Sequence, residues 1–249
     1  MNLTNIQLEE LEFKYLKKIN SFLNSSLDNI IENLLSMNKT KVYWKHLLKK
    51  NTKFDVGAER IIYSILQRAS DLGEPNSTPF SSDLFFENKE AFIHIDLKTC
   101  QPLNNLSDHW RTPVGVNQNS YRGKMKISKG KKIELRQYKP NLPQYYFKKP
   151  TLTYFITILY AEMKSEYVVS NINLACMPNG QLFDVYGSDV IGAGKNKDKT
   201  RFLMNQCFKF NKLPKTPNRV VVVYKNLEVL PKKNATTLSK NFLSLLEQS

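Results

Sequence analysis

Ser81-Ser82-Asp83-Leu84-Phe85-Phe86-Glu87 and Ala91-Phe92-Ile93-His94-Ile95-Asp96-Leu97-Lys98-Thr99 are two segments rich in strand-forming residues. A short polar connection, Glu87-Asn88-Lys89-Glu90, makes a plausible hairpin turn between them. Aromatic and β-branched residues favour strands, and turn residues between two such runs favour a hairpin. The sequence therefore predicts a β-hairpin over residues 81–99.

Polar and apolar residues alternate along the second of these strands. Successive strand residues point to opposite faces, so Asp96 and Lys98 share a face that excludes Ile95 and Leu97. Asp83 comes thirteen positions before Asp96, and the hairpin would bring it back beside Asp96. Two carboxylates and a lysine that meet at a sheet edge can hold a divalent metal ion and act on a phosphate.

This pattern resembles the PD-(D/E)xK nucleases, and in particular the type II restriction endonucleases. Asp83 and then Asp96-Leu97-Lys98 match the motif, with Ser82 in place of its proline. The resemblance implies that the two acids ligate Mg²⁺, with Mn²⁺ as a substitute, and that the lysine orients or activates the attacking water. It also implies double-stranded DNA as the substrate, a homodimer, and a companion DNA methyltransferase in the host.

An acid on a preceding helix often completes such a site, and Glu59 resembles that residue. It lies at the rim of the apolar face of a helix predicted over Val56–Asp71, with Asp55 as the N-cap. A carboxylate in that position needs a partner. The alternative to a metal is an ordinary ion pair with Arg60 or Lys53.

The net charge of +15, from 37 Lys and Arg against 22 Asp and Glu, predicts a polyanionic partner. A positive field attracts polyanions and speeds their association, and binding to DNA phosphates releases condensed counterions. A general bias toward lysine is the alternative, but that bias alone would raise the number of acidic residues as well.

The three cysteines, Cys100, Cys176 and Cys207, make no metal-ligand pattern with the three histidines. We expect reduced thiols in a cytoplasmic protein. The first residues lack the features of a signal peptide, and no apolar run approaches the ~20 residues that span a bilayer. The sequence therefore gives no indication of a membrane partner.

One domain is expected over residues 1–249, with a helical part at 1–50 and a catalytic core at 51–249. A chain of this length with 41% hydrophobic residues can bury a large core. Apolar residues at helical spacing predict one or two helices over 4–37, with a break at Ser25-Ser26, and a short helix over 41–50. These helices could cover the sheet or form a dimer contact.

Residues 99–122 form a long polar segment with few strand or helix signals, and long segments of this kind are usually functional. Asn and Gln can read adenine in the major groove, whereas Ser, Tyr and Arg suit phosphates or guanine. The alternative is a turn-rich loop in an Asn-rich chain. The predicted DNA contacts are Asn117, Gln118, Asn119, Ser120, Tyr121, Arg122, Lys124 and Lys126.

Residues 122–132 carry six basic residues and no acid. They are either a solvated hairpin or, as we expect beside the catalytic hairpin, a contact to the DNA backbone. Lys195, Lys197, Lys199 and Arg201 suggest a second basic loop, because the preceding Gly192-Ala193-Gly194 lacks the pattern of a phosphate-binding loop.

The rest of the core is expected from apolar runs. Residues 152–160 are a helix or a strand, residues 168–176, 182–186 and 219–224 are strands, and residues 238–246 are a helix. The predicted fold is α/β, a mixed central sheet with helices on both faces. The alternatives to a restriction enzyme are a nuclease of the same fold without sequence specificity and a non-catalytic DNA-binding module.

Overall fold

The computed structural model describes residues 3–48, 53–76, 84–101, 107–129, 132–194, 200–226 and 228–229. The chain begins with α1 (Asn5–Ser25), α2 (Leu27–Leu48) and α3 (Phe54–Leu66), then a 3-10 turn (Ser70–Leu72). Thr4 caps α1, and its hydroxyl accepts from the backbone of Gln7. The predicted break at Ser25-Ser26 is confirmed, because Ser26 leaves helical geometry there.

The larger of two sheets has the order β1-β2-β3-β8-β9-β12, and β7 pairs with β8. Its strands are β1 (Glu74–Pro75), β2 (Leu84–Glu87), β3 (Phe92–Cys100), β7 (Tyr145–Tyr146), β8 (Lys149–Met163), β9 (Glu166–Met177) and β12 (Val220–Lys225). β3 and β8 run parallel, and the other neighbouring pairs are antiparallel. The predicted mixed central sheet and its hairpin, β2–β3, are both confirmed.

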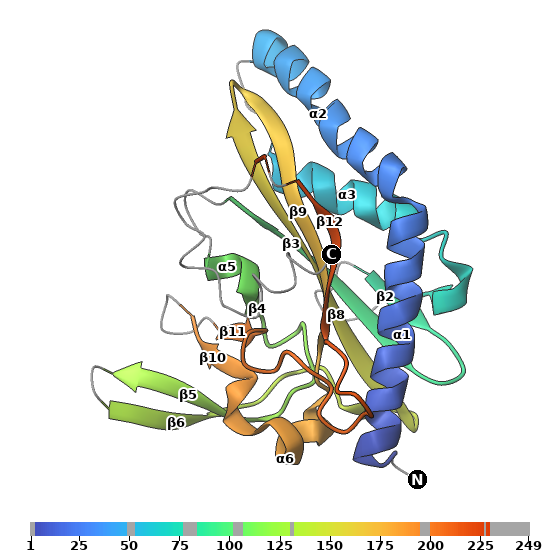
Figure 1. Cartoon of the computed structure of the whole chain (residues 1–249), viewed down its shortest axis with the longest axis vertical. Helices are drawn as coiled ribbons and strands as arrows, with labels where there is room; N and C mark the ends of the chain where they lie inside the picture. The colour runs from blue at the N-terminus through green and yellow to red at the C-terminus, as the bar shows by residue number, and fades with distance from the viewer. Residues whose placement is uncertain are drawn as a thin grey trace.

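A smaller sheet has the order β4-β11-β10-β5-β6. It contains β4 (Arg111–Val114), β5 (Gly123–Lys129), β6 (Lys132–Tyr138), β10 (Ile191–Ala193) and β11 (Thr200–Leu203). β5 and β6 extend from it as a two-stranded ribbon (Figure 1). Between β9 and β10 lie a 3-10 turn (Gly180–Leu182), α6 (Phe183–Tyr186) and a second 3-10 turn (Gly187–Asp189).

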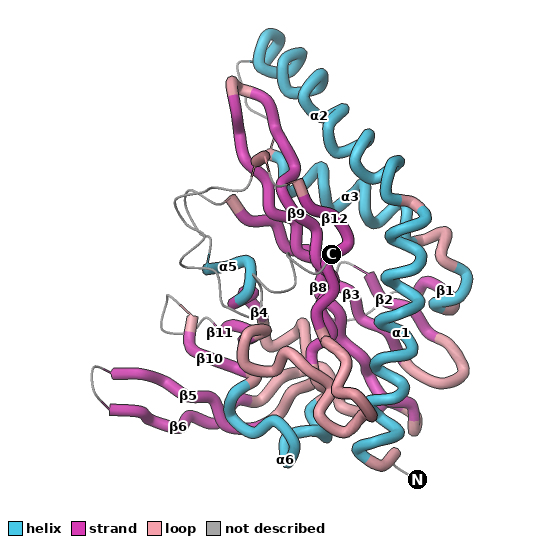
Figure 2. Tube along the Cα trace, in the orientation of Figure 1, coloured by secondary structure: helices cyan, strands magenta, loops and turns pink. Residues whose placement is uncertain are grey.

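The two faces of the larger sheet are covered differently, as Figure 2 shows. Tyr154 of β8 donates its hydroxyl to the Glu12 carbonyl in α1, so this face of β8 meets the helices. The ring of the next residue, Phe155, lies 5.8 Å from that of Phe202 in β11. Thus α1, α2 and α3 lie on one face, and the smaller sheet with α5 (Ser107–Trp110) lies on the other.

Several predictions are corrected by this arrangement. Helices were expected on both faces, but the second face takes mainly a sheet, whose short strands of three or four residues leave little periodic signal. Residues 182–186 are helical turns and not a strand: Asn179 caps the 3-10 turn Gly180–Leu182 through its side chain, and α6 follows directly. The separate helix over 41–50 is part of α2 as far as Leu48.

Three further predictions concern the cap of α3, the run at 152–160 and a helix near the end of the sequence. Lys53, and not Asp55, occupies the N-cap of α3, and the carboxylate of Asp55 lies in the first turn. The ambiguous run at 152–160 is a strand within β8. The helix predicted over residues 238–246 lies outside the described residues.

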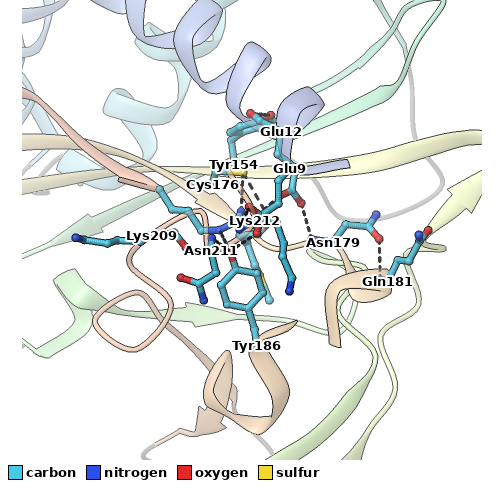
Figure 3. A network of polar contacts seen from close by, with 12 residues as sticks. Glu9, Glu12, Tyr154, Cys176, Asn179, Gln181, Tyr186, Lys209, Asn211 and Lys212 are labelled. Atoms are coloured by element: carbon cyan, nitrogen blue, oxygen red, sulfur yellow. Dashed lines mark hydrogen bonds and ion pairs between the residues drawn. The ribbon is translucent and has the colours of Figure 1, made fainter. Parts of the chain in front are cut away.

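A buried ionic cluster joins α1 to the segment directly before β12 (Figure 3). Arg219, directly before β12, lies 3.2 Å from a Glu9 oxygen and 2.8 Å from a Glu12 oxygen, and all three side chains have no exposed surface. Its guanidinium also packs on the Phe210 ring at 4.0 Å. Burial raises the pKa of the Glu12 carboxyl, and the Arg219 charge opposes that rise. The cluster therefore depends on a single cation between two acids.

Removal of that cation should cost more stability than removal of any exposed pair. We expect Arg219→Met to lower the free energy of unfolding by about 3–5 kcal/mol, because it leaves buried carboxylates without their partner. Adding Glu12→Gln should recover part of the loss by removing one of those charges. Urea unfolding measures both.

The matched control is Lys14→Met, which breaks the exposed Lys14–Glu90 pair and should cost at most about 1 kcal/mol. If Arg219→Met cost no more than Lys14→Met, the cluster would not hold α1 in place.

Candidate active site

The hairpin sets the position of Asp96 and Lys98 on β3. β2 pairs with β3 in a register that joins Leu84 to Ile95, and β8 pairs on the other side with Asp96 opposite Phe155. Residues paired across a sheet share a face. Asp96 and Lys98 therefore point toward the smaller sheet, as Phe155 does. Asp83, the other predicted acid of the motif, lies outside the described residues.

The carboxylate of Asp96 is buried and has two polar neighbours. Lys98 Nζ lies 2.5 Å from Oδ2, and the Asp96 side chain has no exposed surface while Lys98 is 23% exposed. The Gln118 amide donates from Nε2 to Oδ1 at 3.1 Å. A buried charge requires compensation of this kind, because it has lost its hydration. The structure thus brings together Asp96, Lys98 and one residue that was predicted for another role.

Glu59 lies on α3 with an exposed side chain. α3 packs against β3 and buries Ala58, Ile62 and Ile65 on its inner side, so Glu59 is next to the buried stripe, as predicted from the helical spacing. Its part in a metal site stays a prediction.

The chemistry of the donors fits a hard divalent cation. Mg²⁺ prefers carboxylate oxygens, and Oδ2 of Asp96 already holds a cationic group, the Lys98 ammonium. A metal ion could take that oxygen while the half-buried Lys98 moves toward solvent. Among the described residues no three His, Cys, Asp or Glu side chains form a metal-binding group. Completion of the site therefore depends on an acid such as Asp83.

The predicted DNA-reading segment contains three buried side chains. Asn119 donates to the Gly115 carbonyl at 3.0 Å and to the Tyr138 hydroxyl at 2.8 Å, and its Oδ1 accepts from the Tyr121 backbone. The Tyr121 hydroxyl donates to the Gly187 carbonyl at 2.6 Å, and Ser120 is also buried. These three side chains face the protein interior, so we do not carry them into the proposed DNA interface.

Close packing around Ser120 explains part of this burial. A Cβ at Gly180 would lie 2.2 Å from the Ser120 carbonyl oxygen, so a glycine is required where the two segments meet. The segment at 119–121 is therefore fixed by backbone contact as well as by hydrogen bonds.

Other predicted contacts remain at the surface. Arg122 and Lys124 are exposed at the base of the β5–β6 ribbon. Asn117 is half-buried, and its Oδ1 accepts from the Asn141 amide. The side chain of Lys126 and the predicted loop lysines at 195, 197 and 199 lie outside the described residues. Arg201 is mostly buried against Asp108, which argues against its place in a basic loop.

Sequence reasoning missed the place of Gln118 beside the catalytic motif. Its contact with Asp96 joins residues 22 positions apart, one in β3 and the other in the turn between β4 and β5. Local patterns carry no signal for such a pairing. The contact between Gln118 and Asp96 could have been suggested only if a base-reading role had first been excluded for the buried neighbours of Gln118.

The fold and this site define the class of protein. The chain superposes on the restriction endonuclease BglI bound to its DNA recognition sequence with a TM-score of 0.67 and 16% identity, over 88% of this chain and 90% of that one. The tetrameric restriction endonuclease SfiI bound to cognate DNA gives 0.62 and 14% identity, over 82% and 81%. The fold is that of a restriction endonuclease.

Family models place the chain more closely. Residues 4–165 match the N-terminal domain of the type II restriction enzyme MwoI, and residues 169–225 match its central domain. The chain belongs to the family of the type II restriction enzyme MwoI, and it is a type II restriction endonuclease. No curated protein sequence gives a significant match. No helix among the described residues is long and apolar enough to cross a membrane.

The burial of Asn119 leads to a prediction about stability. Asn119→Ala leaves the Tyr121 backbone N–H without its acceptor and the Tyr138 hydroxyl without its donor, and each unsatisfied buried group costs about 1–3 kcal/mol. We expect a clear fall in thermal stability, with Asn117→Ala at the half-buried neighbour as the smaller change. Equal, small losses for the two variants would contradict the structural role of Asn119.

Proposed function

We propose that this enzyme hydrolyses phosphodiester bonds of double-stranded DNA with Mg²⁺ held by Asp83 and Asp96, and that Lys98 serves the attacking water. One observation carries the proposal: a fully buried carboxylate on a central strand lies 2.5 Å from a lysine two residues further along. The family relationship supports it, because site-specific cleavage of DNA is the activity of type II restriction enzymes.

Asp96 acts as the fixed ligand of the site. It lies in the middle of β3, paired with Phe155 of β8 and one residue after Ile95, which pairs with Leu84 of β2, so its backbone is held by the sheet. Mg²⁺, when bound, would stabilise the charge that develops on the phosphate and lower the pKa of a bound water. Asp83 directly precedes Leu84, the partner of the residue next to Asp96, which supports its place as the second ligand.

Lys98 would lose its ion pair with Asp96 when a metal ion binds to that carboxylate. The Lys98 ammonium lies 2.5 Å from Asp96 Oδ2 and neutralises the carboxylate, and a divalent cation held by Asp96 would take over that neutralisation. An ammonium with hydrogen-bond donors and a partly exposed position is suited to hold and orient water beside the phosphate. Mn²⁺ should substitute for Mg²⁺ because both accept oxygen ligands.

DNA would be held along the basic surface at the start of the β5–β6 ribbon. Arg122 and Lys124 are exposed there, Lys126 follows in the same strand, and Asn117 lies in the adjoining turn. Exposed cations close to a nuclease site are suited to phosphate oxygens. In this proposal, Asn117 is the residue that reads a DNA base.

We also propose a homodimer. Type II enzymes usually act on palindromic sites, and a two-fold axis in the protein matches a two-fold axis in the DNA. A companion DNA methyltransferase would protect host DNA. Digestion of a mixed-sequence plasmid tests the specificity: we expect discrete bands, whereas a smear indicates a non-specific nuclease and intact plasmid indicates a binding module.

Asp96 and Lys98 should be indispensable to cleavage. We expect Asp96→Asn to lower the cleavage rate by about 100-fold or more, because it removes the negative charge that is proposed to hold the metal ion beside the reacting phosphate. Lys98→Met should lose cleavage and keep DNA binding, with some loss of thermal stability from the unpaired Asp96. Rates are measured per folded molecule at saturating Mg²⁺.

Lys17→Met on α1 is the control for loss of a lysine, since α1 covers the opposite face of the sheet. It should cleave like the wild type. Near-normal cleavage by Asp96→Asn would remove Asp96 from the metal site.

Glu59 is proposed as a third acid on the family resemblance alone, in which an acid on a preceding helix often completes the site, whereas α3 itself packs on the face of β3 opposite to Asp96. We expect Glu59→Gln to reduce turnover steeply and leave the melting temperature almost unchanged, because an exposed carboxylate contributes little to folding. A fall in stability with unchanged activity per folded molecule would instead assign Glu59 to a structural ion pair.

A further inference from the structure

Gln118 bridges two parts of the protein that the sequence keeps apart. Its Nε2 donates to Asp96 Oδ1 at 3.1 Å, and its Oε1 accepts from the Gly115 backbone N–H at 2.8 Å. Gly115 directly follows β4, an edge strand of the smaller sheet, whereas Asp96 lies in the larger sheet. One side chain thus links the backbone of the turn after β4 to a buried carboxylate of the larger sheet.

The two hydrogen bonds fix the orientation of the amide. An amide group has a donor end and an acceptor end, and a carboxylate can only accept. A flipped Gln118 would set its oxygen against the Asp96 carboxylate and its NH₂ against the Gly115 N–H, losing both bonds. Only one orientation of the amide therefore satisfies both partners.

The turn that carries Gln118 is itself closed by backbone bonds. The Gln118 N–H donates to the Gly115 carbonyl at 3.1 Å, and the Asn141 N–H donates to the Val116 carbonyl at 2.7 Å. A Cβ at Gly115 would lie 3.3 Å from Gln118 Oε1, so a side chain at this position would crowd the amide. Gln118 is therefore held both by the hydrogen bond of its backbone N–H and by the two hydrogen bonds of its side-chain amide.

Gln118 and Lys98 contact different carboxylate oxygens of Asp96. Oδ1 accepts from Gln118, and Oδ2 faces the Lys98 ammonium, the position that a metal ion would take. Groups that hydrogen-bond a metal-binding carboxylate orient it and tune its affinity. The Gln118 bond therefore favours the orientation of the carboxylate in which Oδ2 faces Lys98.

We propose that Gln118 is a positioning residue for Asp96, a role that rests on the proposed function of Asp96 as a metal ligand. It holds the carboxylate with Oδ2 toward Lys98, and it does not read a DNA base. Through Gly115 and the turn at 115–119, it ties the geometry of the catalytic acid to the sheet that carries Arg122 and Lys124.

The test compares Gln118→Met with the wild type. Methionine has nearly the same length and cannot make either hydrogen bond. Binding of Mn²⁺ to the DNA-free protein, measured by electron paramagnetic resonance of free Mn²⁺, should weaken by about 10- to 100-fold. Single-turnover cleavage at subsaturating Mg²⁺ should fall in parallel and recover partly as Mg²⁺ is raised. Affinity for a DNA duplex in EDTA should stay the same.

Asn141→Ala is the matched control, because it removes a side-chain bond to the same turn without contact to Asp96. It should leave Mn²⁺ binding and cleavage unchanged. If Gln118→Met bound Mn²⁺ like the wild type, or lost affinity for one duplex sequence alone, the positioning role would be wrong.

Asp96→Asn separates this inference from the proposed function. Loss of cleavage and of Mn²⁺ binding in Asp96→Asn, together with wild-type behaviour of Gln118→Met, would overturn only the role of Gln118. Wild-type cleavage and Mn²⁺ binding by Asp96→Asn would overturn both.

Discussion

A buried carboxylate in the middle of the larger sheet is the constraint on which the rest of the site depends. Asp96 has no exposed surface, and an isolated charge in that position would cost far more than the fold can supply. The protein meets this cost locally with Lys98 on one oxygen and Gln118 on the other. Under the proposed function, the same carboxylate would be the ligand of a metal ion that takes the place of its neutralising partner, Lys98.

The layers around this strand are held together by a second buried charge. Arg219 pairs with Glu9 and Glu12, so the first helix is attached to the residue directly before β12, an edge strand of the larger sheet. The Tyr186 hydroxyl donates to Glu9, which brings α6 into the same cluster. Helices, larger sheet and the segment leading to the smaller sheet therefore meet at one point.

Local patterns in the sequence predicted the catalytic strand well and the smaller sheet poorly. The alternation around Asp96 and Lys98 gave the hairpin and the shared face, because strand periodicity is a property of neighbouring residues. The strands β4, β10 and β11 are too short to show a period. The contacts of Gln118 and Arg219 depend on residues far away in the chain, so no local pattern predicts them. The buried side chain of Asn119 shows the same limit, because composition alone suggested a residue that reads DNA.

The most direct test of the account is the position of a metal ion in the protein itself. Crystals soaked in Mn²⁺ should show an anomalous-scattering peak about 2 Å from an Asp96 carboxylate oxygen, with the Lys98 ammonium displaced from Oδ2 and the Gln118 bond to Oδ1 retained. A peak bound elsewhere, with the Asp96–Lys98 pair intact in an enzyme that cleaves DNA with Mn²⁺, would contradict it.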